Sequence, residues 1–152
     1  MLPPDNRLSS KVGFARMGTT PTKLTSRQTL LLILLPMLVT FVGHRLYLHL
    51  VRVQHLYPGG YLVHHLFSGA LIVIPAAFIL AFGTRNRVLT IVAPAALGVG
   101  SSMVLDEVVY LIATQASDED YTSPVSLWGS VSLHVLATIL LLVLYRLHCK
   151  AS

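Results

Sequence analysis

The chain alternates long apolar runs with short polar connections. Crossing the roughly 30 Å hydrocarbon core of a bilayer takes about 20 apolar residues in a helix. Four runs meet this requirement, at about residues 29–51, 61–82, 88–114 and 125–147. This pattern predicts an all-α protein, a bundle of four transmembrane helices that occupies residues 29–148.

The first run needs a separate argument because its purely apolar part, Thr29 to Gly43, is short enough for a signal peptide. No small-residue cleavage pattern follows Gly43. Instead, Leu46 and Leu48 continue the apolar pattern, and Arg45 can extend to the membrane interface. We therefore expect a retained transmembrane helix.

Composition supports a membrane protein and excludes an ordinary soluble domain. Of the 152 residues, 54% are hydrophobic and only 11% are charged, and the mean hydropathy is +0.71. Cys149 is the only cysteine, so neither an intramolecular disulfide nor a thiolate metal cage can form.

The distribution of basic residues predicts the orientation. Most of them flank the spans on one side: Arg7, Lys11, Arg16, Lys23, Arg27, Arg85, Arg87, Arg146 and Lys150. The other side has Arg45, Arg52 and the acidic run 118–120. We expect a multi-pass protein of the cell inner (plasma) membrane with cytoplasmic N- and C-termini, and an organellar membrane with the termini in the matrix is the alternative. Residues 1–28 would form a flexible basic cytoplasmic tail, and residues 149–152 a short C-terminal tail.

The net charge of +5 follows from this topology, because the basic residues are spread over the flanks of the spans instead of forming one recognition element. The expected partners are therefore the lipid bilayer and a second membrane protein or another copy of the chain. Nucleic acid is not expected.

Ionisable residues inside the spans are the best indication of function, because a charge at mid-bilayer costs roughly 2.5–3.5 kcal/mol on insertion scales. His64 and His65 begin the second span, and Asp106 and Glu107 lie near the end of the antiparallel third span. A rise of about 1.5 Å per residue puts both pairs near the outer leaflet. Two further histidines come from the first and fourth spans, so the outer half is predicted to contain His44, His64, His65, Asp106, Glu107 and His134.

Helical periodicity predicts which polar residues face the interior. On the third span, Gly98, Ser102 and Asp106 share one stripe and Gly100, Glu107 and Tyr110 the next. The corresponding stripes are Ser126, Ser130 and His134 on the fourth span, Pro36, Thr40, His44 and Tyr47 on the first, and either His65, Gly69 and Ala76 or His64, Ser68 and Pro75 on the second. We expect an interfacial aromatic belt of Tyr57, Tyr61, Tyr121 and Trp128, and an outer turn at Pro58-Gly59-Gly60.

These residues support several functions. The leading hypothesis is a structural or partner-associating network, because paired His, Asp and Glu side chains hold helices in register. The main alternative is a membrane-embedded metal-binding protein or metalloenzyme that uses zinc, iron or manganese. Its strongest ligands would be His65, His134, His44 and Glu107, with Asp106 as a ligand or an orienting partner. A haem between His44 and His134 and a proton or ion pathway are further alternatives, and whether the protein is an enzyme stays open.

Two short motifs resemble those of a family of small bacterial and archaeal polytopic membrane proteins. They are His64-His65-Leu66-Phe67-Ser68-Gly69 in the second span and the glycine-rich segment that ends in Leu105-Asp106-Glu107 in the third. The resemblance covers roughly a third of the chain. It implies residence in a prokaryotic membrane and pairing of the two histidines with the two acids, and it implies no reaction.

Overall fold

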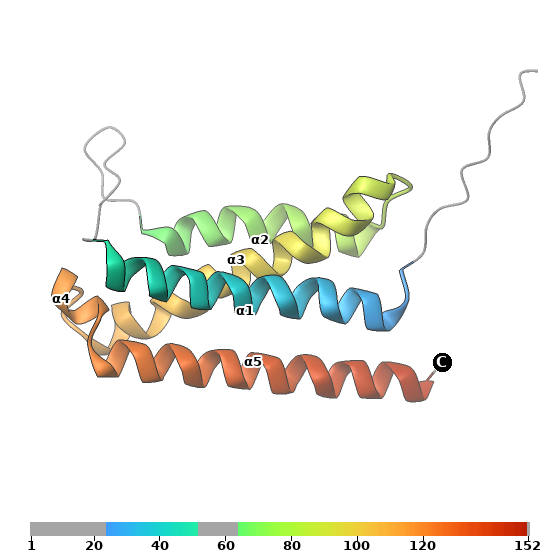
Figure 1. Cartoon of the computed structure of the whole chain (residues 1–152). Coiled ribbons are helices and arrows are strands. Elements are labelled where there is room, and N and C mark those ends of the chain that lie inside the picture. Colours follow the sequence, from blue (N-terminus) through green and yellow to red (C-terminus); the bar gives the residue numbers. More distant parts are fainter. Residues whose placement is uncertain (1–23, 52–63, 152) are drawn as a thin grey trace, which may run out of the picture.

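The computed structural model describes residues 24–51 and 64–151, which form four long helices and a short one (Figure 1). In chain order these are α1 (Ser26–Leu50), α2 (His65–Phe82), α3 (Arg87–Ala113), α4 (Asp118–Tyr121) and α5 (Pro124–Ala151). No strand occurs in these two ranges, so the all-α prediction is confirmed.

The four long helices are long and apolar enough to cross a membrane. They have 18 to 28 residues, and the mean hydropathy of their most apolar windows is 1.8 to 2.1. Their ends lie close to the ends of the four predicted spans. The short helix α4, in the acidic connection between the third and fourth spans, was not predicted. Residues 61–63 of the second predicted span, and the predicted turn at Pro58-Gly59-Gly60, lie outside the described residues.

Local capping explains where several helices begin. Thr25 and Gln28 form a reciprocal capping box at the start of α1. The Asn86 side chain accepts from the Val88 amide at 2.9 Å and begins α3. Ser117 and Asp120 form a second capping box, which explains why a single helical turn, α4, follows α3.

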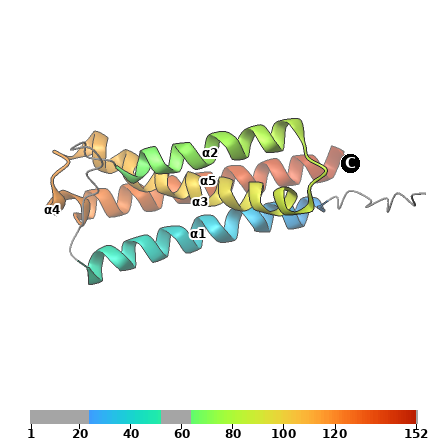
Figure 2. The same cartoon turned by 90° about the horizontal axis from the view of Figure 1, so that it is seen from above.

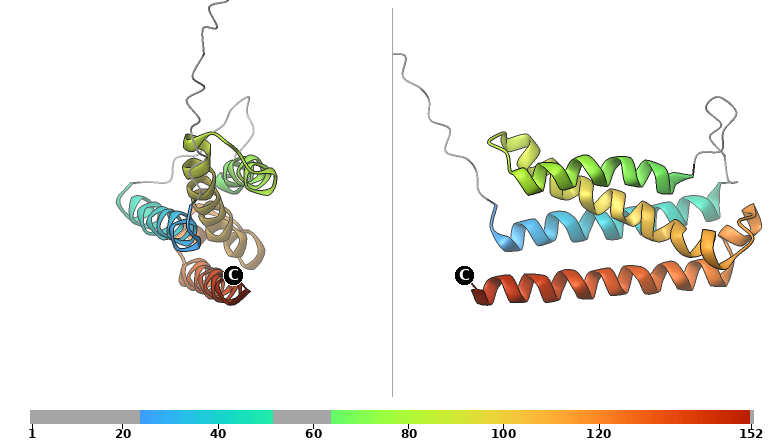
Figure 3. Two further views of the ribbon diagram at one scale, coloured as in Figure 1. Left: turned by 90° about the vertical axis from the view of Figure 1, so that its right-hand side faces the viewer. Right: turned by 180° about the vertical axis from the view of Figure 1, so that it is seen from behind.

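The long helices run alternately up and down, with α3 as the central one. It contacts α1, α2 and α5, and α1 also contacts α5. Figures 1 and 2 show that the start of α1 and the end of α5 lie at the same end of the bundle, as an even number of spans requires. The end-on view in Figure 3 shows α3 crossing between its neighbours. The sidedness of the bundle in a membrane and the two tails stay predictions, and residues 1–23 and 152 lie outside the described part.

Glycines allow α3 to approach its neighbours closely, as the small-residue stripes predicted. A Cβ atom at Gly98 would lie 2.2 Å from the Ile33 carbonyl oxygen of α1. One at Gly100 would lie 2.7 Å from the Gly69 carbonyl oxygen of α2. The two stripes of α3 therefore face different partners, α1 and α2.

Most predicted interior faces agree with the observed burial. Ser126, Ser130 and His134 of α5 are buried, as are Gly69 and Ala76 of α2. On α1 the prediction was partly wrong: Tyr47 is 49% exposed, whereas Met37 and Arg45 are buried. The helix is rotated so that Arg45, and not Tyr47, enters the bundle.

Candidate functional site

Polar side chains from all five helices meet at the end of the bundle where α4 lies. We call this group the polar centre, and its members are His44, Arg45, His64, His65, Asp106, Glu107, Tyr121, Ser126 and Ser130. His64 is the N-cap residue of α2, immediately before its first helical residue. The sequence-predicted clustering of the histidines of the first two spans with Asp106 and Glu107 is therefore observed.

Arg45 connects the members of the polar centre that lie on α3, α4 and α5. It is 6% exposed, and its guanidinium nitrogens lie within hydrogen-bond distance of oxygen atoms of Asp106, Tyr121, Ser126 and Ser130. Its Nε lies 2.6 Å from Asp106 Oδ1, and its Nη1 lies 2.9 Å from the Tyr121 carbonyl oxygen. Its Nη2 lies 2.7 Å from Ser130 Oγ. The expectation that Arg45 extends to the interface was wrong, because its charge is paired inside the bundle and joins α1 to α3, α4 and α5.

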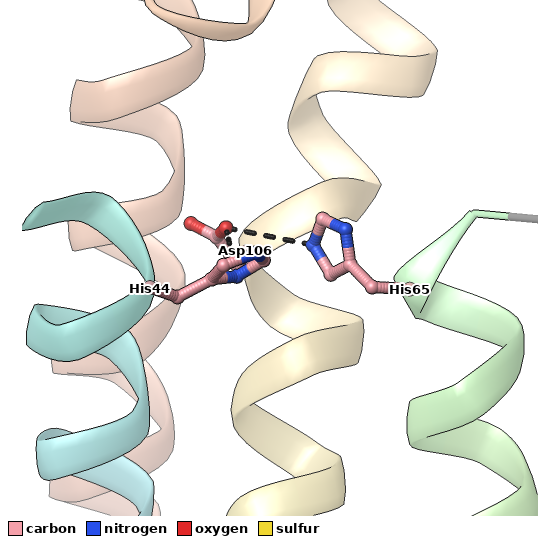
Figure 4. A group of neighbouring side chains, drawn as sticks. All are labelled: His44, His65 and Asp106. Carbon is pink, nitrogen blue, oxygen red and sulfur yellow. Dashed lines mark ion pairs between the residues drawn. The ribbon is translucent and has the colours of Figure 1, made fainter. Parts of the chain in front are cut away.

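The second carboxylate oxygen of Asp106 faces two histidines. His44 Nδ1 lies 3.4 Å and His65 Nε2 lies 3.6 Å from Asp106 Oδ2. One ligand atom from each of these residues lies within 4.8 Å of the other two. Figure 4 shows the three side chains, from α1, α2 and α3, pointing toward one another. Asp106 is 1% exposed, whereas the histidine side chains are 24% and 20% exposed, so the histidines form the more exposed side of the group.

Glu107 connects the histidine pair to the start of α2. Its Oε1 lies 2.5 Å from His64 Nδ1, and its Oε2 lies 3.2 Å from His65 Nδ1. Oε2 also accepts from the Leu66 amide at 2.6 Å. The first amides of a helix have no partner within it and favour a negative charge. His64 makes no side-chain cap bond, so a carboxylate from α3 caps α2.

The capping role of Glu107 gives a first prediction. In Glu107→Ala, the Leu66 amide and the two histidines lose their acceptor, and the bundle is expected to lose about 1–3 kcal/mol of stability. Hydrogen exchange of the Leu66 amide in detergent micelles should accelerate more than that of amides in the middle of α2. Unchanged exchange at Leu66 would contradict the capping role.

His134 lies next to the polar centre and bonds to one of its members, Ser130. Its Nδ1 lies 2.8 Å from the Ser130 carbonyl oxygen, and its Nε2 lies 3.1 Å from Ser102 Oγ. Its ring packs against Phe41, with the centroids 4.2 Å apart. Nδ1 thus bonds to α5, and Nε2 bonds to α3. His134 is not among the residues whose ligand atoms converge, His44, His65 and Asp106, and its grouping with them in the metal and haem hypotheses stays a prediction.

Tyr121 is the member of the polar centre that sequence reasoning missed. It was expected in an interfacial aromatic belt, but it is only 6% exposed, in contrast to Trp128 at 66%. Its hydroxyl donates to Asp106 Oδ2. Burial, and after it the negative charge of Asp106, raises the pKa of Tyr121 above its usual range. One feature of the sequence could have indicated this position. The Ser117–Asp120 capping box begins a helical turn, and Tyr121 lies at the end of that turn.

The pairing implied by the family resemblance is present in the structure, since His64 contacts Glu107 and His65 contacts both acids. No protein-family model, curated protein or solved structure matches the chain.

Proposed function

We propose that this chain is a multi-pass integral membrane protein that binds a transition-metal ion through His44, His65 and Asp106. The observation that carries the proposal is the convergence of three ligand atoms, with Asp106 Oδ2 lying 3.4 Å from His44 Nδ1 and 3.6 Å from His65 Nε2. Ligands at about 2.1 Å from a tetrahedral zinc ion are separated by roughly 3.4 Å. The spacing therefore suits a common ion.

Neighbouring groups orient two of these three side chains, His65 and Asp106, as they do in known metal sites, where a second hydrogen bond fixes a ligand. Glu107 Oε2 lies 3.2 Å from His65 Nδ1, which leaves Nε2 available for an ion. Arg45 binds Asp106 Oδ1, which directs Oδ2 toward the histidines. Imidazole and carboxylate ligands suit zinc, iron and manganese.

The predicted orientation places this site on the outer side of the membrane. If both termini are cytoplasmic, the end of the bundle that contains α4 faces outward. The partly exposed His44 and His65 side chains then receive an ion from the outside.

A structural or partner-associating network is the second candidate function. It is favoured by the complete pairing of polar groups: in residues 24–51 and 64–151, every buried side-chain nitrogen and oxygen has a hydrogen-bond partner. In this case the pairs hold the helices in register, and no ion is required.

Equilibrium dialysis of the purified, metal-depleted protein against Co²⁺ and Zn²⁺ distinguishes these functions. Wild type is expected to bind about one equivalent, and His44→Ala and His65→Ala should each weaken binding at least tenfold because a ligand is lost. His148→Ala, in the last turn of α5 at the opposite end, is the matched control and should bind as wild type does. Folded wild-type protein that binds neither ion would overturn the metal proposal in favour of the network.

A further inference from the structure

The Tyr121 hydroxyl lies between two of the three proposed ligand atoms. It donates to Asp106 Oδ2, and it lies 2.9 Å from His65 Nε2. An ion held at about 2.1 Å from both atoms would also be adjacent to this oxygen. An ion that binds these two atoms on the side of Tyr121 either displaces the hydroxyl or takes it as a ligand.

Packing around Tyr121 favours retention of its position. The Arg45 guanidinium carbon lies 4.9 Å from the centroid of the Tyr121 ring, and Arg45 Nη1 binds the Tyr121 carbonyl oxygen at 2.9 Å. The Tyr110 ring packs against Tyr121 in an edge-to-face arrangement, with the centroids 4.8 Å apart. With backbone, ring and hydroxyl all held and only 6% of the residue exposed, there is little room to turn away.

We propose that Tyr121 is the fourth ligand and that the completed site, which rests on the proposed metal function, selects ferric iron. The phenol O–H bond breaks as the iron–oxygen bond forms, and the proton passes to solvent water. Iron enters and stays in the ferric state, so no oxidant or reductant takes part.

The charges of the polar centre support a trivalent ion. Asp106 and Glu107 contribute two carboxylates, and Arg45 compensates only one of them by direct contact. A Tyr121 phenolate would add a third negative oxygen. Such hard oxygen donors favour hard cations, and tyrosine is a known ligand of iron in proteins.

The test uses the full-length protein in detergent and ferric nitrilotriacetate as the iron source. Wild type is expected to develop a broad visible absorption band from phenolate-to-iron charge transfer, and Tyr121→Phe should lose this band. Tyr47→Phe is the matched control, since Tyr47 lies on the outside of α1 and is 49% exposed; it should keep the band. Tyr121→Phe should still bind Co²⁺ within tenfold of wild type through the three remaining ligands.

Failures of the two proposals give different results. A band that persists in Tyr121→Phe, or wild type that binds Co²⁺ and develops no band with iron, overturns tyrosine ligation and leaves the three-ligand site. Wild type that binds neither ion overturns both proposals. If Tyr121→Phe does not fold, resonance Raman spectra of iron-loaded wild type decide, because tyrosinate vibrations are expected and their absence overturns the proposal.

Discussion

Replacing Arg45 by methionine is expected to destabilise the bundle by about 3–5 kcal/mol, the usual cost of removing one partner from a buried ion pair. Asp106, which is 1% exposed, would keep a charge inside the bundle without its 2.6 Å partner. The hydroxyls of Ser126 and Ser130 and the carbonyl oxygen of Tyr121 would lose a donor as well. Unfolding in mixed detergent micelles, followed by helical circular dichroism, measures the loss.

A double variant separates the ion pair from general damage to packing. Arg45→Met combined with Asp106→Leu removes both charges, so it should be more stable than Arg45→Met alone. Arg87→Met is the matched control, because Arg87 begins α3 and is exposed, and its unfolding should equal that of wild type. The pairing argument fails if Arg45→Met unfolds like wild type, or if the double variant is the less stable one.

Gly98→Ala is expected to destabilise the bundle by about 1–3 kcal/mol, because the added methyl group overpacks the contact between α1 and α3. The added Cβ would lie 2.2 Å from the Ile33 carbonyl oxygen and 3.2 Å from the Met37 amide nitrogen. Both are backbone atoms, so α1 and α3 must move apart. Unfolding in detergent measures the loss.

Gly43→Ala is the control for this prediction, because a Cβ at Gly43 meets no atom of a neighbouring helix within 4 Å in the part of the chain that the structure describes. Alanine favours a helix over glycine by up to about 1 kcal/mol, so Gly43→Ala should be neutral or slightly stabilising. Equal losses in the two variants would show that the cost does not come from the contact between α1 and α3.

The sequence predicted the helices and the depth of the polar residues, because both follow from distances along the chain. Runs of apolar residues set the spans, and a fixed rise per residue placed His64 and His65 level with Asp106 and Glu107. The observed contacts, 2.5 Å from His64 to Glu107 and 3.6 Å from His65 to Asp106, confirm that the two pairs lie level with each other.

Rotation of a helix about its axis is less predictable, because packing sets it. His44 and Arg45 point about 100° apart on α1, and the apolar pattern around them allowed either one to face the interior. Both reach Asp106 in the structure, one through each carboxylate oxygen. The role of Tyr121 was hidden for another reason: a turn in the connection between two spans returns it to the bundle, and a hydropathy pattern does not record such a return.

The hydrogen-bond partners of Arg45 lie far along the chain, and this separation determines when its charge is compensated. Its partners come 61 to 85 residues later, on α3, on α4 and at the start of α5. During synthesis, α1 is therefore complete before any of these partners exists. A chain that ends before α3 lacks these acceptors, so the charge of Arg45 is compensated only after the later helices have been synthesised.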